Sequence, residues 1–188
     1  MYAIQARYRG RELKRAEYVS KAAVALSTLE GVEQFTLVGV EDIASIIDTA
    51  DATCDTALAL LAAGDWAVAI AVMDTTTATS EDALAFVHKV LGPRARAGTV
   101  KVGVKKDKKW AAPIQAAFVM LAYILSKRTA EGREATSLMR SGLNQIEAAE
   151  ELGISKQAIS QRLQAAGWQA ELAGYQLAID LLQRANID

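Results

Sequence analysis

The sequence has one cysteine and one histidine, so several kinds of site are excluded at the outset. Cys54 has no second cysteine for a disulfide within the chain, and His88 has no cysteine or histidine at zinc-like spacing. No glycine-rich phosphate loop occurs, and nothing around His88 suggests a catalytic serine or base. No run of 18 apolar residues is present, and no charged-then-apolar leader follows Met1. We therefore expect a cytoplasmic protein with no membrane span, metal, cofactor or enzymatic activity.

The sequence also has no excess of positive or negative charge, since 21 Lys and Arg residues nearly balance 22 Asp and Glu residues, for a net charge of −1. The distribution is uneven: residues 1–21 and 94–109 are basic, residues 22–93 are acidic, and residues 110–188 are close to neutral. Because phosphate neutralisation supplies most non-specific DNA affinity, a near-neutral segment binds DNA weakly as a single copy. A DNA-binding role would need two copies or help from the basic segments.

The first half of the chain alternates between strand and helix patterns. Strands are predicted at Tyr2–Tyr8, Gln34–Val40, Trp66–Met73 and Thr99–Val104, and helices at Glu12–Leu29, Thr53–Ala63 and Glu81–Leu91. The segment Ile43–Asp48 is compatible with a paired strand or a short helix. The unbroken apolar run Trp66–Met73 is typical of a central strand buried on both faces. Residues 1–104 are thus predicted to form an α/β sandwich that serves as a regulatory or dimerisation domain.

The second half reads as helical. The charged run Lys105–Lys109 is predicted to be a linker at residues 105–109, followed by an all-α domain over residues 110–188. Helices are expected at Ala111–Lys127, Ala130–Arg140 and Gln169–Ala185, besides the helical pair described next. The first and last of these carry more apolar positions than so small a domain can enclose. We therefore expect a homodimer, which would present two copies of the helical domain to a partner.

The stretch Asn144–Trp168 is predicted to form two short helices joined by a tight turn. The first helix spans about Asn144–Leu152, and Gly153 follows where a helix ends in a left-handed residue. Ser155 then caps a second helix over about Lys156–Ala166. This arrangement is that of a helix-turn-helix.

Residue types within this stretch favour a DNA-binding version of the motif. Ala149, Gly153 and Ile159 occupy the close-packing, turn and core positions of a helix-turn-helix. The side chains left outward are hydrogen-bonding groups with one lysine and one arginine, as needed to read base edges and touch phosphates. These predicted DNA-binding residues are Ser155, Lys156, Gln157, Ser160, Gln161 and Arg162. The alternative is a helical hairpin used for packing or for protein contact.

Residues 126–182, from SKRTAEGREA to YQLAIDLL, resemble the DNA-binding end of the SatD-like and related actinobacterial helix-turn-helix proteins. The segments FTLVGVEDIASIID and GDWAVAIAV resemble the front part of the same family. Between residues 74 and 109 the likeness is limited to secondary structure. The resemblance implies a DNA-binding protein with an N-terminal sheet of the ferredoxin-like, nucleotidyl-cyclase type.

The nucleotidyl-cyclase type of sheet holds metal and phosphates with a first-strand aspartate and a Gly-Asp-Glu turn, and this chain departs at both places. Its first strand has Ala6 and Arg7, and its turn reads Gly39-Val40-Glu41-Asp42. Two-metal chemistry requires carboxylates from both strand ends to converge. We therefore expect Glu41 and Asp42 to lie in a solvated turn. The nearby cations are expected to form a solvated rim rather than a phosphate site: Arg7, Arg9, Arg11, Lys14 and Arg15.

The sequence thus predicts an α+β protein with a ferredoxin-like α/β sandwich followed by an all-α helix-turn-helix domain. The predicted function is sequence-specific binding of double-stranded DNA by a homodimeric transcriptional regulator. Two alternatives stay open: an adaptor that binds protein through the helical domain, and a degenerate nucleotidyl-cyclase-like protein that binds a nucleotide.

Overall fold

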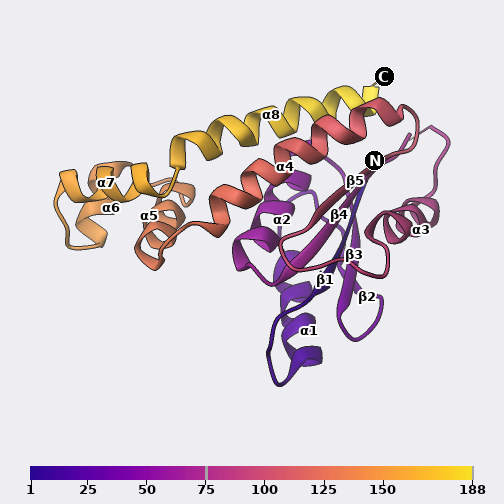
Figure 1. Ribbon diagram of the computed structural model, residues 1–188, viewed down its shortest axis with the longest axis horizontal. Helices are drawn as coiled ribbons and strands as arrows, with labels where there is room; N and C mark the ends of the chain where they lie inside the picture. The colour runs from indigo at the N-terminus through magenta and orange to yellow at the C-terminus, as the bar shows by residue number, and fades with distance from the viewer. Residues whose placement is uncertain (75, 188) are drawn as a thin grey trace.

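The computed structural model describes residues 1–74 and 76–187 as an α+β fold (Figure 1). The strands are β1 (Tyr2–Tyr8), β2 (Thr36–Leu37), β3 (Asp42–Ile47), β4 (Trp66–Val72) and β5 (Val100–Val104). The helices among them are α1 (Arg15–Leu26), α2 (Ala50–Ala63) and α3 (Ser80–Leu91). After a 3-10 turn at Lys108–Trp110 follow α4 (Ala111–Ser126), α5 (Ala130–Arg140), α6 (Gln145–Glu151), α7 (Lys156–Ala165) and α8 (Trp168–Ile187).

The five strands form one mixed sheet in the order β2-β3-β1-β4-β5. Strand β1 pairs antiparallel with both β3 and β4, whereas β4 and β5 are parallel and joined through α3. The segment Ile43–Asp48, which the sequence left undecided, is therefore part of strand β3. The predicted strand Gln34–Val40 is shortened to the two residues of β2, which pairs only with β3 at the edge of the sheet.

The side chains of β4 alternate between the two faces of the sheet. All seven of its residues are buried, as the apolar run predicts. Its large side chains, from Trp66 to Val72, enter the main hydrophobic core, while its alanines face α3 on the other side. Because alanines leave room for a close helix, α3 packs against this face through Ala83, Val87 and Leu91.

The main core lies on the opposite face and draws on both halves of the chain. Helices α1 and α2 contribute to it, and so do Ile114 and Phe118 of α4 and Ile179 and Leu182 of α8. In Figure 1 the long helices α4 and α8 lie side by side across the sheet body. The segment Lys105–Lys109 therefore does not separate two cores. Helix α4 packs on the valines of β5 as well as on α8, so the sheet and the two long helices share one core.

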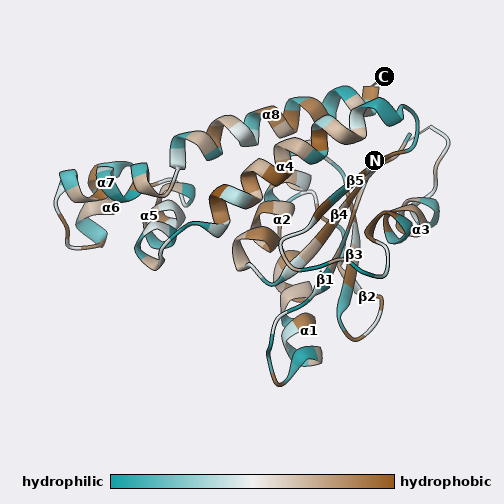
Figure 2. Cartoon of the chain, viewed as in Figure 1, coloured by the Kyte–Doolittle hydropathy of each residue, from teal (hydrophilic) through white to brown (hydrophobic). Residues whose placement is uncertain are grey.

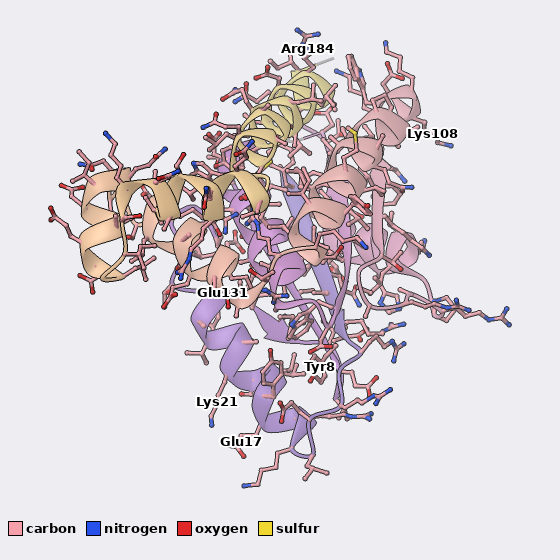
Figure 3. The ribbon with its side chains drawn as sticks, turned by 60° about the vertical axis from the view of Figure 1, so that its left-hand side comes forward. Tyr8, Glu17, Lys21, Lys108, Glu131 and Arg184 are labelled. Carbon is pink, nitrogen blue, oxygen red and sulfur yellow. The ribbon has the colours of Figure 1, made fainter. Side chains whose placement is uncertain are left out.

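A third, smaller cluster belongs to α5, α6, α7 and the start of α8, which we call the helical head (residues 130–168). Figure 1 shows the helical head projecting from the ends of α4 and α8, away from the sheet. Figure 3 shows the same unit from another side, with Glu131 near its base and its side chains spreading away from the body of the molecule. The helical head is thus a compact appendage on two long helices.

Helix α4 is apolar on its outer side as well as its inner side. Its inner side is buried, but Val119, Met120 and Tyr123 are 49%, 55% and 65% exposed. In Figure 2 the helix is mainly brown and tan between teal ends. By length and composition alone the stretch Lys108–Ser126 could span a bilayer, although 28% of it is buried within the protein. The outer side of α4 is therefore an apolar surface that the described residues leave uncovered.

Candidate nucleic-acid interface

Two local features set the start of α6 and the turn that follows it. The side chain of Asn144 accepts hydrogen bonds from the backbone N–H groups of Ile146 and Glu147, and Glu147 Oε2 accepts from the N–H of Asn144 at 2.7 Å. This reciprocal capping box fixes the start of α6. Gly153 has a φ of +61°, a conformation that glycine adopts without the strain of a Cβ, and the chain turns there into α7.

Helix α7 begins as the sequence predicts. The hydroxyl of Ser155 accepts a hydrogen bond from the backbone N–H of Ala158 at 3.1 Å. Ile159 and Leu163 then face inward and are buried beside Ala149 of α6. The two short helices are therefore packed together through the small and apolar side chains that the sequence predicted to face inward.

The outer face of α7 is polar and free. Ser155, Lys156, Gln157, Ser160 and Gln161 are exposed. In the part of the chain that the structure describes, the last four make no side-chain hydrogen bond or ion pair. Since the hydrogen-bonding groups of these side chains are unused, they are available to base edges or phosphates.

Arg162 is placed differently from the other predicted readers. Its guanidinium forms an ion pair with Glu134 of α5 at 3.7 Å, and its side chain is 30% exposed. Three and four residues before it, Ile159 and Ala158 turn toward the inside of the helical head, so Arg162 lies at the edge of the outer face. The structure therefore brings together the other five predicted residues and turns Arg162 toward α5.

A buried charge cluster attaches the helical head to α8. The carboxylate of Glu171 forms ion pairs with Arg128 and Arg140, and both Glu171 and Arg128 are buried. Arg128 also donates from Nε to the carbonyl of Ala166 at 2.9 Å, and burial lowers the pKa of its guanidinium. Because a buried carboxylate is stable only when paired, this cluster fixes where the head sits relative to α8.

Sequence reasoning missed the role of Glu171. A signal was present, because Glu171 shares the inner side of α8 with Trp168 and lies one helical turn from it. A lone carboxylate on an apolar helical side indicates a buried partner of opposite charge. The sequence alone could not say which arginine that partner would be.

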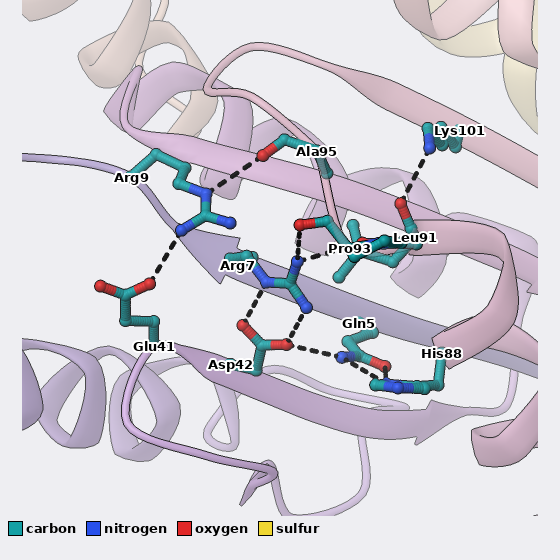
Figure 4. Close-up of polar contacts among 11 residues, drawn as sticks. Gln5, Arg7, Arg9, Glu41, Asp42, His88, Leu91, Pro93, Ala95 and Lys101 are labelled. Atoms are coloured by element: carbon teal, nitrogen blue, oxygen red, sulfur yellow. Dashed lines mark hydrogen bonds and ion pairs between the residues drawn. The ribbon is translucent and has the colours of Figure 1, made fainter.

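The second candidate site, at the ends of β1 and β3, is a closed network (Figure 4). Arg7 donates from Nε and Nη2 to the two carboxylate oxygens of Asp42, each at 2.7 Å. Gln5 donates to Asp42 at 3.0 Å and lies 3.2 Å from Nδ1 of His88. Asp42 is 8% exposed, so the expectation that it lies in a solvated turn is wrong. Its register opposite Arg7 draws it into the sheet.

Glu41 is likewise engaged. Its carboxylate pairs with Arg9 at 2.8 Å and with Arg15 at 2.9 Å. Three cations of the predicted solvated rim therefore hold the two acids in place. Among residues 1–74 and 76–187, no group of three or more His, Cys, Asp or Glu side chains lies close enough to hold a metal ion. The chemistry of this end of the sheet is structural pairing of arginines with carboxylates.

Comparison of the chain with protein-family models, with curated proteins and with solved structures gives no match. The argument for a function therefore depends on the geometry of the helical head and of the sheet.

Proposed function

We propose that this protein binds double-stranded DNA sequence-specifically as a transcriptional regulator and inserts α7 into the major groove. The observation that carries the proposal is the free outer face of α7, where Gln157, Ser160 and Gln161 stand exposed beside Lys156. The helical head projects from the body, so a duplex could approach this face without meeting the sheet (Figure 1). A helix-turn-helix reads bases with the N-terminal part of its second helix, which is where these residues lie.

The residue types suit this role. Gln157 and Gln161 are four positions apart and share one side of α7. A glutamine amide can donate to and accept from the edge of an adenine, which gives sequence discrimination. Lys156, next to the capped start of the helix, suits a phosphate contact that adds affinity for all sequences.

We propose that the sheet body is a ferredoxin-like regulatory or dimerisation module without enzymatic activity. In its support, the antiparallel order β2-β3-β1-β4, with helices α1 and α2 in the two connections, is that of a β-α-β-β-α-β ferredoxin-like sheet, to which β5 is added. The carboxylates of Glu41 and Asp42 are paired with arginines, which leaves them poorly suited to bind a metal–phosphate group.

Two copies of the chain would supply more of the positive charge that DNA binding needs to neutralise phosphates. The acidic residues of α6, Glu147, Glu150 and Glu151, are exposed close to α7, and Arg162 is paired with Glu134. One helical head therefore offers few free cations. A homodimer that pairs the exposed apolar side of α4 would supply two recognition helices related by a two-fold axis. The charge-free composition of α4 from Ala111 to Ser126 fits contact with an identical surface.

The test is DNA binding by the full chain, measured by fluorescence anisotropy on selected genomic fragments at two salt concentrations. We expect Gln157→Ala to lose about 1–3 kcal/mol of discrimination between sites. Lys156→Ala should weaken binding to all sequences and reduce the salt slope by about one. The matched control is Gln183→Ala, an exposed glutamine on the sheet end of α8.

An adaptor role is the competing function, and the acidic surface of α6 is the observation that favours it. If Gln157→Ala and Lys156→Ala both bind DNA like the wild type while melting at the same temperature, α7 does not read the groove. The adaptor hypothesis would then replace the proposal.

A further inference from the structure

A cavity of about 390 Å³ opens where the helical head meets the sheet body. Helix α2 of the body forms one wall, the end of α5 forms another, and the first two turns of α8 form the floor. The apolar lining consists of Leu58, Ala59, Met139, Trp168, Leu172 and Tyr175. This volume and this mostly apolar lining are typical of sites for small molecules.

Few charged groups line the cavity, and they differ in how many of their hydrogen-bonding positions are already used by other residues. Both oxygens of Glu171 are already engaged, one with Arg128 and the other with Arg140. Arg140 lies with its guanidinium 5.9 Å from the ring centre of Trp168, and its side chain is 38% exposed. Within the described part of the chain, Glu171 is the only residue that forms an ion pair with Arg140, while Asp55 attracts it from farther away. Arg140 therefore keeps unused N–H donors at the mouth of the cavity.

The opposite wall supplies a carboxylate. Asp55 lies on the exposed side of α2 and lines the cavity together with Tyr175. Burial, with hydrogen bonding to Asp55, raises the pKa of the Tyr175 hydroxyl above its ordinary value. A tyrosine hydroxyl is protonated at neutral pH, so that of Tyr175 can act as a donor toward Asp55. One donor leaves most of the lone-pair positions of that carboxylate free, since an ionised carboxylate has about four.

We infer that this cavity binds a small zwitterion with an apolar body, of the chemical class of free apolar α-amino acids. The ligand carboxylate would accept from Arg140, its ammonium group would donate to Asp55, and its side chain would fill the space between Met139 and Leu172. The fixed charges are balanced, because Arg128 and Arg140 oppose Glu171 and Asp55. A ligand without net charge preserves this balance, whereas a simple anion or cation upsets it.

The site would connect the two parts of the molecule. Its walls come from α2 in the sheet body and from α5 in the helical head, so a bound ligand contacts both. Binding therefore favours the position of the head in which these walls face each other. The inference goes beyond the proposed function and holds whether or not the head binds DNA, and its test uses the full chain without DNA.

The experiment is isothermal titration calorimetry of the full chain with L-phenylalanine, L-tryptophan and L-leucine at millimolar concentration. At least one should bind. Three matched compounds each lack one feature of phenylalanine: L-phenylalaninamide has no carboxylate, 3-phenylpropanoate has no ammonium group, and glycine has no apolar body. We expect each loss to weaken binding by about tenfold or more, which corresponds to about 1.4 kcal/mol.

Substitutions of residues that line the cavity test whether the ligand binds there. Arg140→Gln and Asp55→Asn should each weaken binding of the best amino acid by about tenfold or more. Ala59→Phe fills the cavity from its exposed rim and should abolish binding without disturbing the core. Arg184→Gln, on the far part of α8, is the control and should bind like the wild type. Thermal unfolding checks that each variant is folded.

Three results would overturn the inference. The first is the absence of binding by all three amino acids to the folded wild-type chain. The second is equal binding of the amide or of 3-phenylpropanoate, which would show that the ligand is not recognised as a zwitterion. The third is unchanged binding by Ala59→Phe and Asp55→Asn, which would place the ligand elsewhere.

Discussion

Arg7 of β1 and Asp42 of β3 stand opposite each other in the sheet and are joined by two hydrogen bonds of 2.7 Å. The same guanidinium donates from Nη1 to the carbonyls of Gly92 and Pro93, each at 3.0 Å. One side chain thus ties together two strands and the segment after α3. At these strand ends a cation and an acid therefore neutralise each other.

Removing either member of this pair should destabilise the fold. Arg7→Ala and Asp42→Ala should each cost about 2 kcal/mol, because both side chains are nearly buried and the partner is left unpaired. The double variant should lose clearly less than the sum, with a coupling energy of about 1 kcal/mol or more. Urea unfolding measures these values. Arg11→Ala, at an exposed arginine with no ion pair in the described residues, is the control. Additive losses would mean that the pair contributes nothing as a pair.

The ion pair between Arg162 and Glu134 should restrain DNA binding. Because exposed pairs contribute about 0–1 kcal/mol, Glu134→Gln should leave the unfolding free energy nearly unchanged. It should free Arg162, raise the affinity for DNA of any sequence and increase the salt slope by about one. Glu30→Gln makes the same charge change on the sheet body and is the control. Equal affinity gains in both variants would show an effect of net charge alone.

Assembly should depend on the exposed side of α4. Sedimentation velocity at micromolar concentration should show a dimer for the wild type. Met120→Glu places a charge in the middle of the apolar surface and should shift the protein to monomer, since a buried unpaired charge is costly. Gln183→Glu, an equal charge change on the exposed side of α8, should remain dimeric. A wild-type monomer would remove this role for α4.

The segment Lys105–Lys109 should be cut by trypsin without releasing two domains. Lys106 and Lys108 are exposed, so cleavage there is expected early. The two products should stay together, because α4 and α8 share a core with the sheet. Size-exclusion chromatography of the nicked protein, followed by denaturing electrophoresis, distinguishes the outcomes. Elution as two separate folded fragments would restore the predicted division at residues 105–109.

The hydroxyl of Tyr2 should make stability depend on alkaline pH. It donates to the carbonyl of Leu182 at 3.2 Å, and burial raises the pKa of Tyr2 from 10.0 to about 12. Stability linked to the neutral hydroxyl is therefore present below pH 10 and lost as the pH rises toward 12. The stability difference between wild type and Tyr2→Phe should fall by about 1.4 kcal/mol between about pH 8 and pH 11.

For the alkaline prediction, Tyr123→Phe is the matched control. Tyr123 is 65% exposed, so its substitution makes the same chemical change outside the core. Urea unfolding at the two pH values gives the free energies. A difference between wild type and Tyr2→Phe that does not vary with pH would show that the hydroxyl of Tyr2 is solvated.

Local features of this protein were determined by the sequence itself. The cap at Ser155, the turn at Gly153 and the inward position of Ile159 were all predicted, and each is decided by neighbours within a few residues. The buried strand β4 was predicted for a similar reason, since an unbroken apolar run has to be covered on both faces. That the outer face of α7 reads DNA stays a prediction.

Only the tertiary structure decided which surfaces cover one another. An apolar pattern shows that α4 and α8 each have a side to bury, but it does not show that the sheet would bury it. Likewise, Arg7 and Asp42 are 35 residues apart, and Arg128 and Glu171 are 43 apart, so no local rule pairs them. Such pairs form because folding brings a few charges into an apolar interior, where each must find a partner of opposite sign. The cavity between α2, α5 and α8 arises in the same way, from the meeting of three helices that are distant in the chain.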